Sequence, residues 1–216
     1  MSNAAIIVAS GTSRRMGFDK LAIEWQGRPI LWHSVRAFTT LEEIDQVVVV
    51  APPKRFEWLH DLGPKVMRVD GGRERSDSVA AGLKTLDEQV THVAIHDGAR
   101  PLVTREAILT TFAIARKTGA ACLARRVTET LKRATSENIA IESVSRDDLW
   151  TMETPQIFDR SLIQRAYHEV NSEDAQITDE VSALQLLGHG TTLVENQTPN
   201  PKITTPADCH RLSGFS

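Results

Sequence analysis

A short segment near the N-terminus concentrates residues that can bind phosphate. Residues 10–20 read S-G-T-S-R-R-M-G-F-D-K and directly follow a strand-like apolar run at residues 4–9. Small residues let the backbone approach a phosphate closely, and consecutive N–H groups in such a loop can form an anion-binding concavity. Arg14, Arg15 and Lys20 add three positive charges within seven residues. We interpret the segment as a phosphate-binding loop. The alternative is a solvated turn that carries scattered charges.

The loop differs from two common nucleotide-binding patterns. It contains neither the dinucleotide fingerprint G-x-G-x-x-G nor the Walker A pattern G-x-x-x-x-G-K-[ST]. An oxidoreductase that binds a dinucleotide would not need this density of cations. The interpretation that remains is a site for a triphosphate whose phosphorus is itself attacked.

Strand-like and helix-like segments alternate behind this loop. Short apolar, β-branched runs predict buried strands at residues 4–9, 46–50, 65–69, 92–96, 120–124 and 191–195. Helical spacing of apolar residues occurs between them, at residues 30–38, 78–86, 105–115, 161–170 and 179–187. The alternation predicts an α/β fold in which a mostly parallel sheet carries helices on both faces. Ligands bind at the carboxyl ends of the strands in such folds, so the important loops should follow Ala9, Val50, Val69 and His96.

Three helix ends can be placed from local chemistry. Thr104 is the expected N-cap of the helix at 105–115. Thr178 is the expected N-cap of the helix at 179–187, and Gly188 is expected to end it.

Residues 125–150 interrupt the alternation. The segment is charged, rich in Thr and Ser, and shows strand-like alternation at 138–144. We interpret it as a β-hairpin arm that stands off the main sheet. An isolated hairpin is marginally stable in water, so packing against a second subunit would explain the arm. We expect residues 1–216 to form one domain that carries this arm.

Composition excludes several classes of protein. The chain has 216 residues, of which 41% are apolar, so it can bury a sizeable core. A net charge of −3 argues against a nucleic-acid surface. Cys122 and Cys209 are far apart in the sequence, which favours neither a disulfide framework nor a Cys-based metal site. The apolar runs are too short for a membrane span or a signal peptide, and we expect a cytoplasmic protein.

A series of ordered motifs resembles a known family. The motifs are A-S-G-T-S-R-R-M followed by Lys20, G-G-R-E-R-S-D-S-V-A-A-G-L at 71–83, H-D-G-A-R-P at 96–101, E-T-L-K-R at 129–133, T-P-Q-I-F at 154–158, T-D-E-V-S-A at 178–183 and N-P-K-I-T-T-P-A-D at 200–208. Over nearly its whole length the chain resembles the 2-C-methyl-D-erythritol 4-phosphate cytidylyltransferases of the non-mevalonate isoprenoid pathway. The resemblance implies a Rossmann-like nucleotidyltransferase fold, a homodimer clasped through the arm, and Mg²⁺ delivered with CTP. It also implies transfer of CMP from CTP to methylerythritol phosphate, which gives 4-CDP-2-C-methyl-D-erythritol and pyrophosphate.

The resemblance also implies roles for individual residues. It suggests that the catalytic cations are Arg15, Lys20 and Lys202. It suggests that the nucleotide site comprises Ala9, Ser10, Gly11, Thr12, Ser13, Gly72, Ser78, Asp97 and Gly98. Within that set, Gly72 and Ser78 resemble the cytosine pocket, and Asp97 resembles the residue beside the ribose and the metal. It suggests that the sugar-alcohol phosphate is contacted by Thr130, Thr154 and Arg146, the last from the other subunit.

Each role has a plainer alternative. Asp97 could cap the turn after a strand, and His96 is more simply a strand-end residue than a ligand. Ser78 could begin a helix. Lys202 alone is typical of a surface lysine, and Thr154 before Pro155 could be only an extended step.

Several features depart from the family pattern. Ser13 replaces a glycine in the first loop, and the stretch 16–20 is shorter than usual. Arg73 stands where an acidic residue is common, Glu129 replaces an aspartate, and Pro201 stands where an aliphatic residue is usual. These departures keep two alternatives open. One is a cytidylyltransferase for another polyol phosphate such as ribitol 5-phosphate, and the other is a non-catalytic nucleotide-binding regulator.

Overall fold

Seven strands pair into one sheet in a computed structural model, which describes residues 2–11, 17–172, 176–212 and 214. In spatial order they are β11 (Thr192–Glu195), β7 (Ala120–Arg126), β10 (Trp150–Asp159), β6 (Val90–Asp97), β1 (Ser2–Val8), β4 (Gln46–Val50) and β5 (Val66–Val69). β10 runs antiparallel to both β6 and β7, and the other pairings in this sheet are parallel. The predicted mostly parallel sheet is confirmed.

The register brings the carboxyl ends of the central strands to one level. Val8 of β1 pairs with Asp97 of β6 on one side and with Val50 of β4 on the other. Val50 in turn pairs with Val69 of β5. The loops that follow these strands therefore emerge together at one edge of the sheet.

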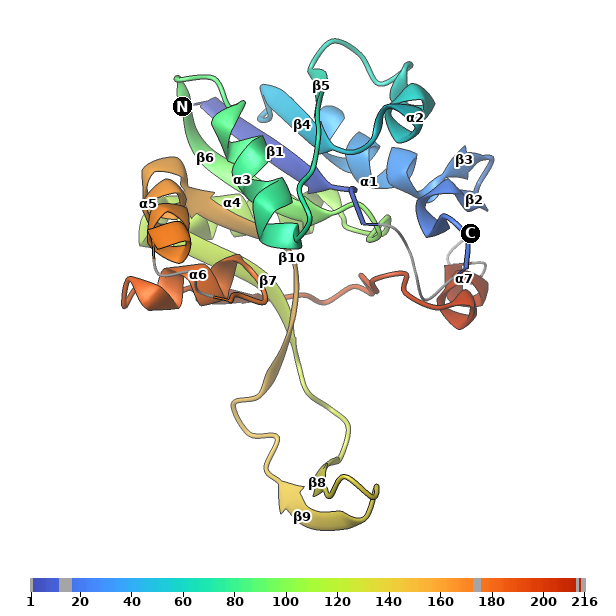
Figure 1. Ribbon diagram of the computed structural model, residues 1–216, viewed down its shortest axis with the longest axis vertical. Helices are drawn as coiled ribbons and strands as arrows, with labels where there is room; N and C mark the ends of the chain where they lie inside the picture. The colour runs from blue at the N-terminus through green and yellow to red at the C-terminus, as the bar shows by residue number, and fades with distance from the viewer. Residues whose placement is uncertain (1, 12–16, 173–175, 213, 215–216) are drawn as a thin grey trace.

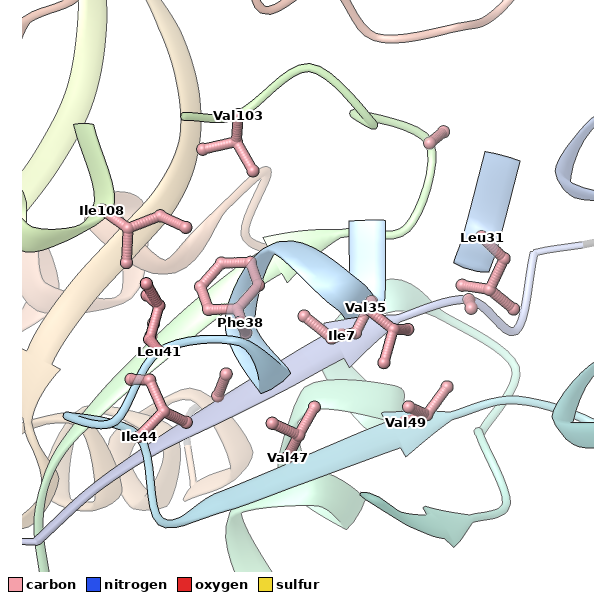
Figure 2. Packing of buried hydrophobic residues seen from close by; sticks show 14 of the residues in the cluster. Ile7, Leu31, Val35, Phe38, Leu41, Ile44, Val47, Val49, Val103 and Ile108 are labelled. Carbon is pink, nitrogen blue, oxygen red and sulfur yellow. The ribbon is translucent and has the colours of Figure 1, made fainter. Parts of the chain in front are cut away.

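Helices cover both faces of the sheet. The cluster on one face includes side chains of α1 (Ile30–Thr39), α4 (Arg105–Thr118) and α7 (Pro206–Leu212). The cluster on the other includes side chains of α3 (Arg75–Lys84), α5 (Arg160–Ser172) and α6 (Glu180–Leu186). Alternate residues of each central strand serve the two faces, because successive side chains of a strand point in opposite directions. Figure 2 shows Ile7 packing with Val35 and Phe38 on the first face, whereas Ile6 belongs to the second.

Short elements complete the chain between β1 and β5. They are η1 (Lys20–Ala22), β2 (Glu24–Trp25), β3 (Arg28–Pro29), α2 (Pro53–Phe56) and η2 (Glu57–Leu59). Sequence periodicity did not predict them, because none is long enough to show a period. None of the helices in the described part of the chain has the length and apolarity that crossing a bilayer requires.

The predicted helix ends are partly correct. The Thr104 hydroxyl accepts a hydrogen bond from the N–H of Ala107 at 3.1 Å, so this N-cap is confirmed. The assignment of Thr178 was wrong, because the Asp179 carboxylate accepts from the N–H of Ser182 at 2.9 Å and caps the helix one residue later. Gly188 follows this helix with a φ of +66°, a conformation that glycine adopts without steric cost.

The hairpin arm predicted at 125–150 is present. β8 (Leu131–Ala134) and β9 (Ala140–Val144) form a separate two-stranded sheet, and Figure 1 shows it standing well away from the main sheet, beyond β7 and β10. Three large apolar side chains are exposed on the arm, namely Ile139 (58%), Ile141 (61%) and Leu149 (38%).

Candidate functional site

Asp97 ends β6 and is surrounded by cations. Its Oδ2 lies 3.0 Å from Lys202 Nζ and 3.4 Å from Arg100 Nε, and its Oδ1 lies 3.4 Å from Arg75 Nε. Burial alone would raise the pKa of this carboxyl, but the three positive charges outweigh burial and hold the pKa well below its usual range. Asp97 is therefore ionised, and three cations surround this one carboxylate.

A second buried carboxylate holds one of these cations in place. Glu180 is completely buried and accepts two hydrogen bonds from Arg75, at 2.5 and 3.0 Å. The Tyr167 hydroxyl donates to the same carboxylate at 3.0 Å. Burial and the charge of Glu180 raise the pKa of Tyr167, which keeps this phenol protonated as a donor. Arg75 is thus fixed from α6 while it faces Asp97.

The segment that carries Lys202 is bound to the sheet on both sides of that residue. The Asn200 side chain donates to the Thr154 carbonyl at 2.9 Å, and Arg100 donates to the Asn200 carbonyl at 2.7 Å. The Ile203 N–H donates to the carbonyl of Ala99 at 2.9 Å. These bonds set the backbone of Lys202 beside the end of β6.

The first loop meets this C-terminal segment. Lys20 begins η1, and its ammonium group donates to the carbonyl of Ile203 at 2.7 Å. At the start of the loop, the Ala9 N–H donates to the Val50 carbonyl at 2.9 Å. The structure therefore brings Lys20 and Lys202, which sequence analysis predicted as catalytic, to neighbouring positions. The other predicted residues of the loop, Thr12, Ser13 and Arg15, lie outside the described residues.

A hydroxyl pair lies between the first loop and the start of α3. The Ser10 and Ser78 hydroxyl oxygens are 2.8 Å apart, and the Gly72 N–H donates to Ser78 Oγ at 3.3 Å. The packing leaves no room for a side chain on the neighbouring glycine, because a Cβ on Gly71 would lie 2.5 Å from Ser10 Cβ. Ser78 does not begin the helix as the plainer alternative held, since α3 starts at Arg75. The residues predicted for the cytosine pocket are thus adjacent.

Two further predicted residues lie next to Asp97. A Cβ on Gly98 would lie 2.9 Å from Leu31 Cδ1 and 3.2 Å from the Val8 carbonyl oxygen, so a larger residue there would force Leu31 to shift. Thr154 is 3% exposed, and its hydroxyl accepts from the Asp97 N–H at 3.1 Å and lies 3.0 Å from His96 Nδ1. Thr154, which lies on the neighbouring strand β10, is thus hydrogen-bonded to the end of β6.

The remaining predicted acceptor contacts lie on the arm. Thr130 precedes β8 and is exposed, and Arg146 follows β9. The described hydrogen bond of the Arg146 guanidinium goes to the carbonyl of Thr128, within the arm. A single chain does not bring these two residues to the cluster around Asp97, because the arm points away from the sheet (Figure 1).

Sequence analysis missed several residues of the site. Arg75 and Arg100 stand inside quoted motifs, but their pairing with Asp97 depends on contacts between α3 and β6 and on a turn. Glu180 looks like an ordinary acidic residue in the first turn of a helix. Nothing in the neighbouring sequence indicates that its side chain is buried. Arg55 was also missed. Its place shortly after β4 could have indicated it, because ligands bind at the carboxyl ends of the strands in such folds.

The chain is similar to known proteins over nearly its whole length. A family model described as "IspD: 2-C-methyl-D-erythritol 4-phosphate cytidylyltransferase" matches residues 3–213. The chain belongs to this cytidylyltransferase family. It is 38% identical over 216 residues to a 2-C-methyl-D-erythritol 4-phosphate cytidylyltransferase from Halalkalibacterium halodurans, covering 96% of this chain and 94% of the relative. It is 35% identical over 214 residues to one from Alkaliphilus oremlandii, covering 95% and 91%.

Solved cytidylyltransferases share the fold. The crystal structure of the Francisella tularensis 2-C-methyl-D-erythritol 4-phosphate cytidylyltransferase superimposes with a TM-score of 0.87 at 28% identity and covers all of both chains. A 4-diphosphocytidyl-2C-methyl-D-erythritol synthase from Anaerococcus prevotii gives a TM-score of 0.86 at 28% identity, covering 99% of this chain and 95% of that one. The predicted Rossmann-like nucleotidyltransferase fold is therefore confirmed, and so is the family resemblance.

Proposed function

We propose that the cluster at the ends of β1 and β6 transfers CMP from CTP to 2-C-methyl-D-erythritol 4-phosphate, giving 4-CDP-2-C-methyl-D-erythritol and pyrophosphate. The observation that carries the proposal is the meeting of Lys20 with the segment of Lys202, in a member of this cytidylyltransferase family. Cations from opposite ends of the chain then surround the place where a triphosphate would enter after β1.

The nucleotide is expected to lie along the first loop. Its phosphates would follow Ala9, Ser10 and Gly11, where small residues allow close approach of the backbone. Its base would lie beside the Ser10 and Ser78 hydroxyls and the backbone of Gly72. This arrangement is supported by the 2.8 Å contact between the two hydroxyls.

The reaction needs positioned charge more than proton transfer. The acceptor phosphate monoester has a second pKa near 6, so it is largely a dianion at neutral pH. One of its oxygens attacks the α-phosphorus, the bond from that phosphorus to the bridging oxygen breaks, and pyrophosphate leaves with the bonding electrons. No proton has to be removed from the nucleophile.

Lys20 and Lys202 are proposed to stabilise the negative charge that gathers on the α-phosphoryl oxygens. Fixed charges aimed at a transition state account for much of the rate enhancement in phosphoryl transfer. Lys202 suits this role because its side chain is 40% exposed while its partner carboxylate is 10% exposed, so its ammonium group can face a ligand. Arg15 would add a third cation from the loop.

We propose that the magnesium ion is held mainly by the nucleotide and by few protein ligands. Among the residues that the structure describes, no group of three or more His, Cys, Asp and Glu side chains is arranged to hold a metal ion. Mg²⁺ in nucleotide enzymes typically takes one or two protein carboxylates together with substrate phosphates and water. We propose that Asp97 supplies one such oxygen. When bound, the ion would neutralise charge on the triphosphate oxygens.

We further propose that two copies associate through the arm and complete each other's acceptor site. The exposed Ile139 and Ile141 on β9 and the preceding turn support an interface there, because apolar side chains of this size favour burial. Thr130 and Arg146 lie on the same arm, so a partner's arm could supply them to the cluster around Asp97. A reducing cytoplasm is the proposed location, in keeping with two free cysteines.

A panel of acceptors tests the proposed function. Purified protein with Mg²⁺ and CTP should release pyrophosphate with 2-C-methyl-D-erythritol 4-phosphate and much more slowly with ribitol 5-phosphate. A preference for ribitol 5-phosphate would overturn the choice of acceptor, which the departures at Arg73 and Glu129 left open. Binding of CTP, seen as a raised melting temperature, without turnover on any acceptor would indicate a nucleotide-binding regulator instead.

A further inference from the structure

Arg55 is a buried cation next to the first loop and outside the cluster around Asp97. It belongs to α2, directly after β4, and is 5% exposed. Its guanidinium donates to the carbonyls of Ala9 and Gly11, the latter at 2.9 Å. It also donates to both carboxylate oxygens of Asp19, from Nε at 2.7 Å and from Nη2 at 3.0 Å. One side chain thus binds four acceptors.

These acceptors belong to the two ends of one loop. Ala9 and Gly11 lie where the loop leaves β1, and Asp19 lies where it enters η1. A guanidinium presents its donors in a rigid, planar fork, so simultaneous bonds to both ends fix the distance between them. An ammonium group at the end of a flexible chain is a single point charge and would fix that distance poorly.

The bonds to the start of the loop also orient its backbone. In a trans peptide group the carbonyl and the N–H point in opposite directions. Because the Ala9 carbonyl faces Arg55, the N–H of Ser10 points away from it. Carbonyl oxygens would repel a triphosphate. By binding those of Ala9 and Gly11, Arg55 keeps them away from the face of the loop where we expect the triphosphate.

The bonds to the end of the loop set the position of Lys20. The Asp19 carboxylate also accepts from the N–H of Leu21 at 3.1 Å and so caps η1. Lys20 lies between these two residues and reaches the Ile203 carbonyl at 2.7 Å. A change at Arg55 would release Asp19 and with it the backbone from which the Lys20 side chain extends.

We propose that Arg55 is a positioning residue that holds both ends of the phosphate-binding loop and thereby sets Lys20 for reaction with CTP. Its hydrogen bonds to the described residues go to Ala9, Gly11 and Asp19, so we expect it to act on the nucleotide through the loop. This inference rests on the proposed function of the loop.

Four single variants and one double variant separate a positioning role from a purely structural one. Arg55→Met removes the fork, Arg55→Lys keeps the charge, and Asp19→Asn weakens the distal bond while retaining a helix cap. The matched control is Arg105→Met, which removes an exposed arginine at the start of α4 that pairs with Glu43 at 3.1 Å. Melting temperatures are recorded first, and kinetics are then measured well below the lowest of them.

Arg55→Met is expected to lower kcat/KM for CTP by about 100-fold, the effect of a misplacement near 1 Å. KM for the acceptor should change far less, and Arg55→Lys should restore part of the loss. Asp19→Asn combined with Arg55→Met should be no worse than Arg55→Met alone, because both act on one loop. Arg105→Met should retain normal kinetics.

Unchanged kinetics in a folded Arg55→Met enzyme would overturn the proposal, even if its melting temperature fell. If that variant does not fold, Asp19→Asn decides, since the Asp19 side chain is 35% exposed and its loss is tolerable. Normal kinetics in Asp19→Asn would then count against the role. If the wild-type protein itself shows no turnover, the proposed function fails, and calorimetric titration with CTP tests Arg55 separately through weakened binding by Arg55→Met.

Discussion

Lys202 Nζ lies 3.0 Å from Asp97 Oδ2, which joins the C-terminal segment to the carboxyl end of β6. The two partners differ in exposure, because the lysine side chain is 40% exposed and the aspartate side chain 10%. Arg75 and Arg100 also face this carboxylate. The lysine is therefore the cation of this cluster that can most readily turn towards a ligand.

Lys202→Met is expected to reduce kcat by about 10²- to 10³-fold, the effect of deleting one transition-state donor. The melting temperature should change little, because an ion pair with an exposed lysine contributes about 1 kcal/mol or less. Steady-state kinetics with CTP and methylerythritol phosphate provide the measurement. Lys117→Met on α4 is the matched control. A normal kcat for Lys202→Met would remove Lys202 from the catalytic cations.

Glu180 is expected to be a large contributor to stability. Glu180→Ala leaves Arg75 without its main partner in a buried place, and loss of one partner of a buried pair costs about 3 kcal/mol. Tyr167→Phe removes one neutral donor to the same carboxylate and should cost about 1 kcal/mol. Urea unfolding of both variants measures the difference. Equal losses would show that the Arg75 pair is not the dominant contact.

His96 should make the protein less stable in mild acid. Burial lowers the pKa of His96 to about 4, against the raising effect of Asp97, whereas an unfolded histidine titrates near 6.5. Between these values the unfolded state binds more protons, so the free energy of unfolding falls as the pH falls, by up to about 1.4 kcal/mol per pH unit. His96→Gln should flatten this slope between pH 6.5 and 4.5. Thermal unfolding at each pH gives the free energy of unfolding. If this free energy changed equally with pH in the wild type and in His96→Gln, the lowered pKa would be contradicted.

The arm is expected to hold two copies together. Ile139→Glu with Ile141→Glu should convert a dimer into a monomer in analytical ultracentrifugation, because charges replace the apolar surface of the arm. Activity should fall with the dimer if the partner supplies Thr130 and Arg146. Leu186→Glu alters an apolar residue of α6 that is 41% exposed and is the control. A wild-type monomer that is fully active would contradict the proposed shared site.

Much of the fold could be predicted because its signals are local. Buried parallel strands such as β4 are continuous apolar runs, and Thr104 caps its helix through a bond three residues away. β10 had no such signal. Its polar residues Glu153 and Gln156 are buried, and their partners come from distant elements: Asn196 donates to the first and Asp179 accepts from the second.

The site shows the same division. Lys20 and Lys202 could be named because the family motifs that contain them imply their roles. Glu180 also stands in a quoted motif, but its role, like that of Arg55, comes from what it contacts across the fold. Long-range contacts of this kind leave no period or spacing in the sequence.

The most direct measurement follows product formation by ³¹P NMR with CTP, Mg²⁺ and 2-C-methyl-D-erythritol 4-phosphate, for the wild-type protein and Lys20→Met. We predict that the wild type forms a cytidine diphosphate ester and pyrophosphate in equal amounts, and that Lys20→Met forms them at least about 100-fold more slowly while remaining folded. No product from the wild type, or product at an undiminished rate from Lys20→Met, would contradict the account.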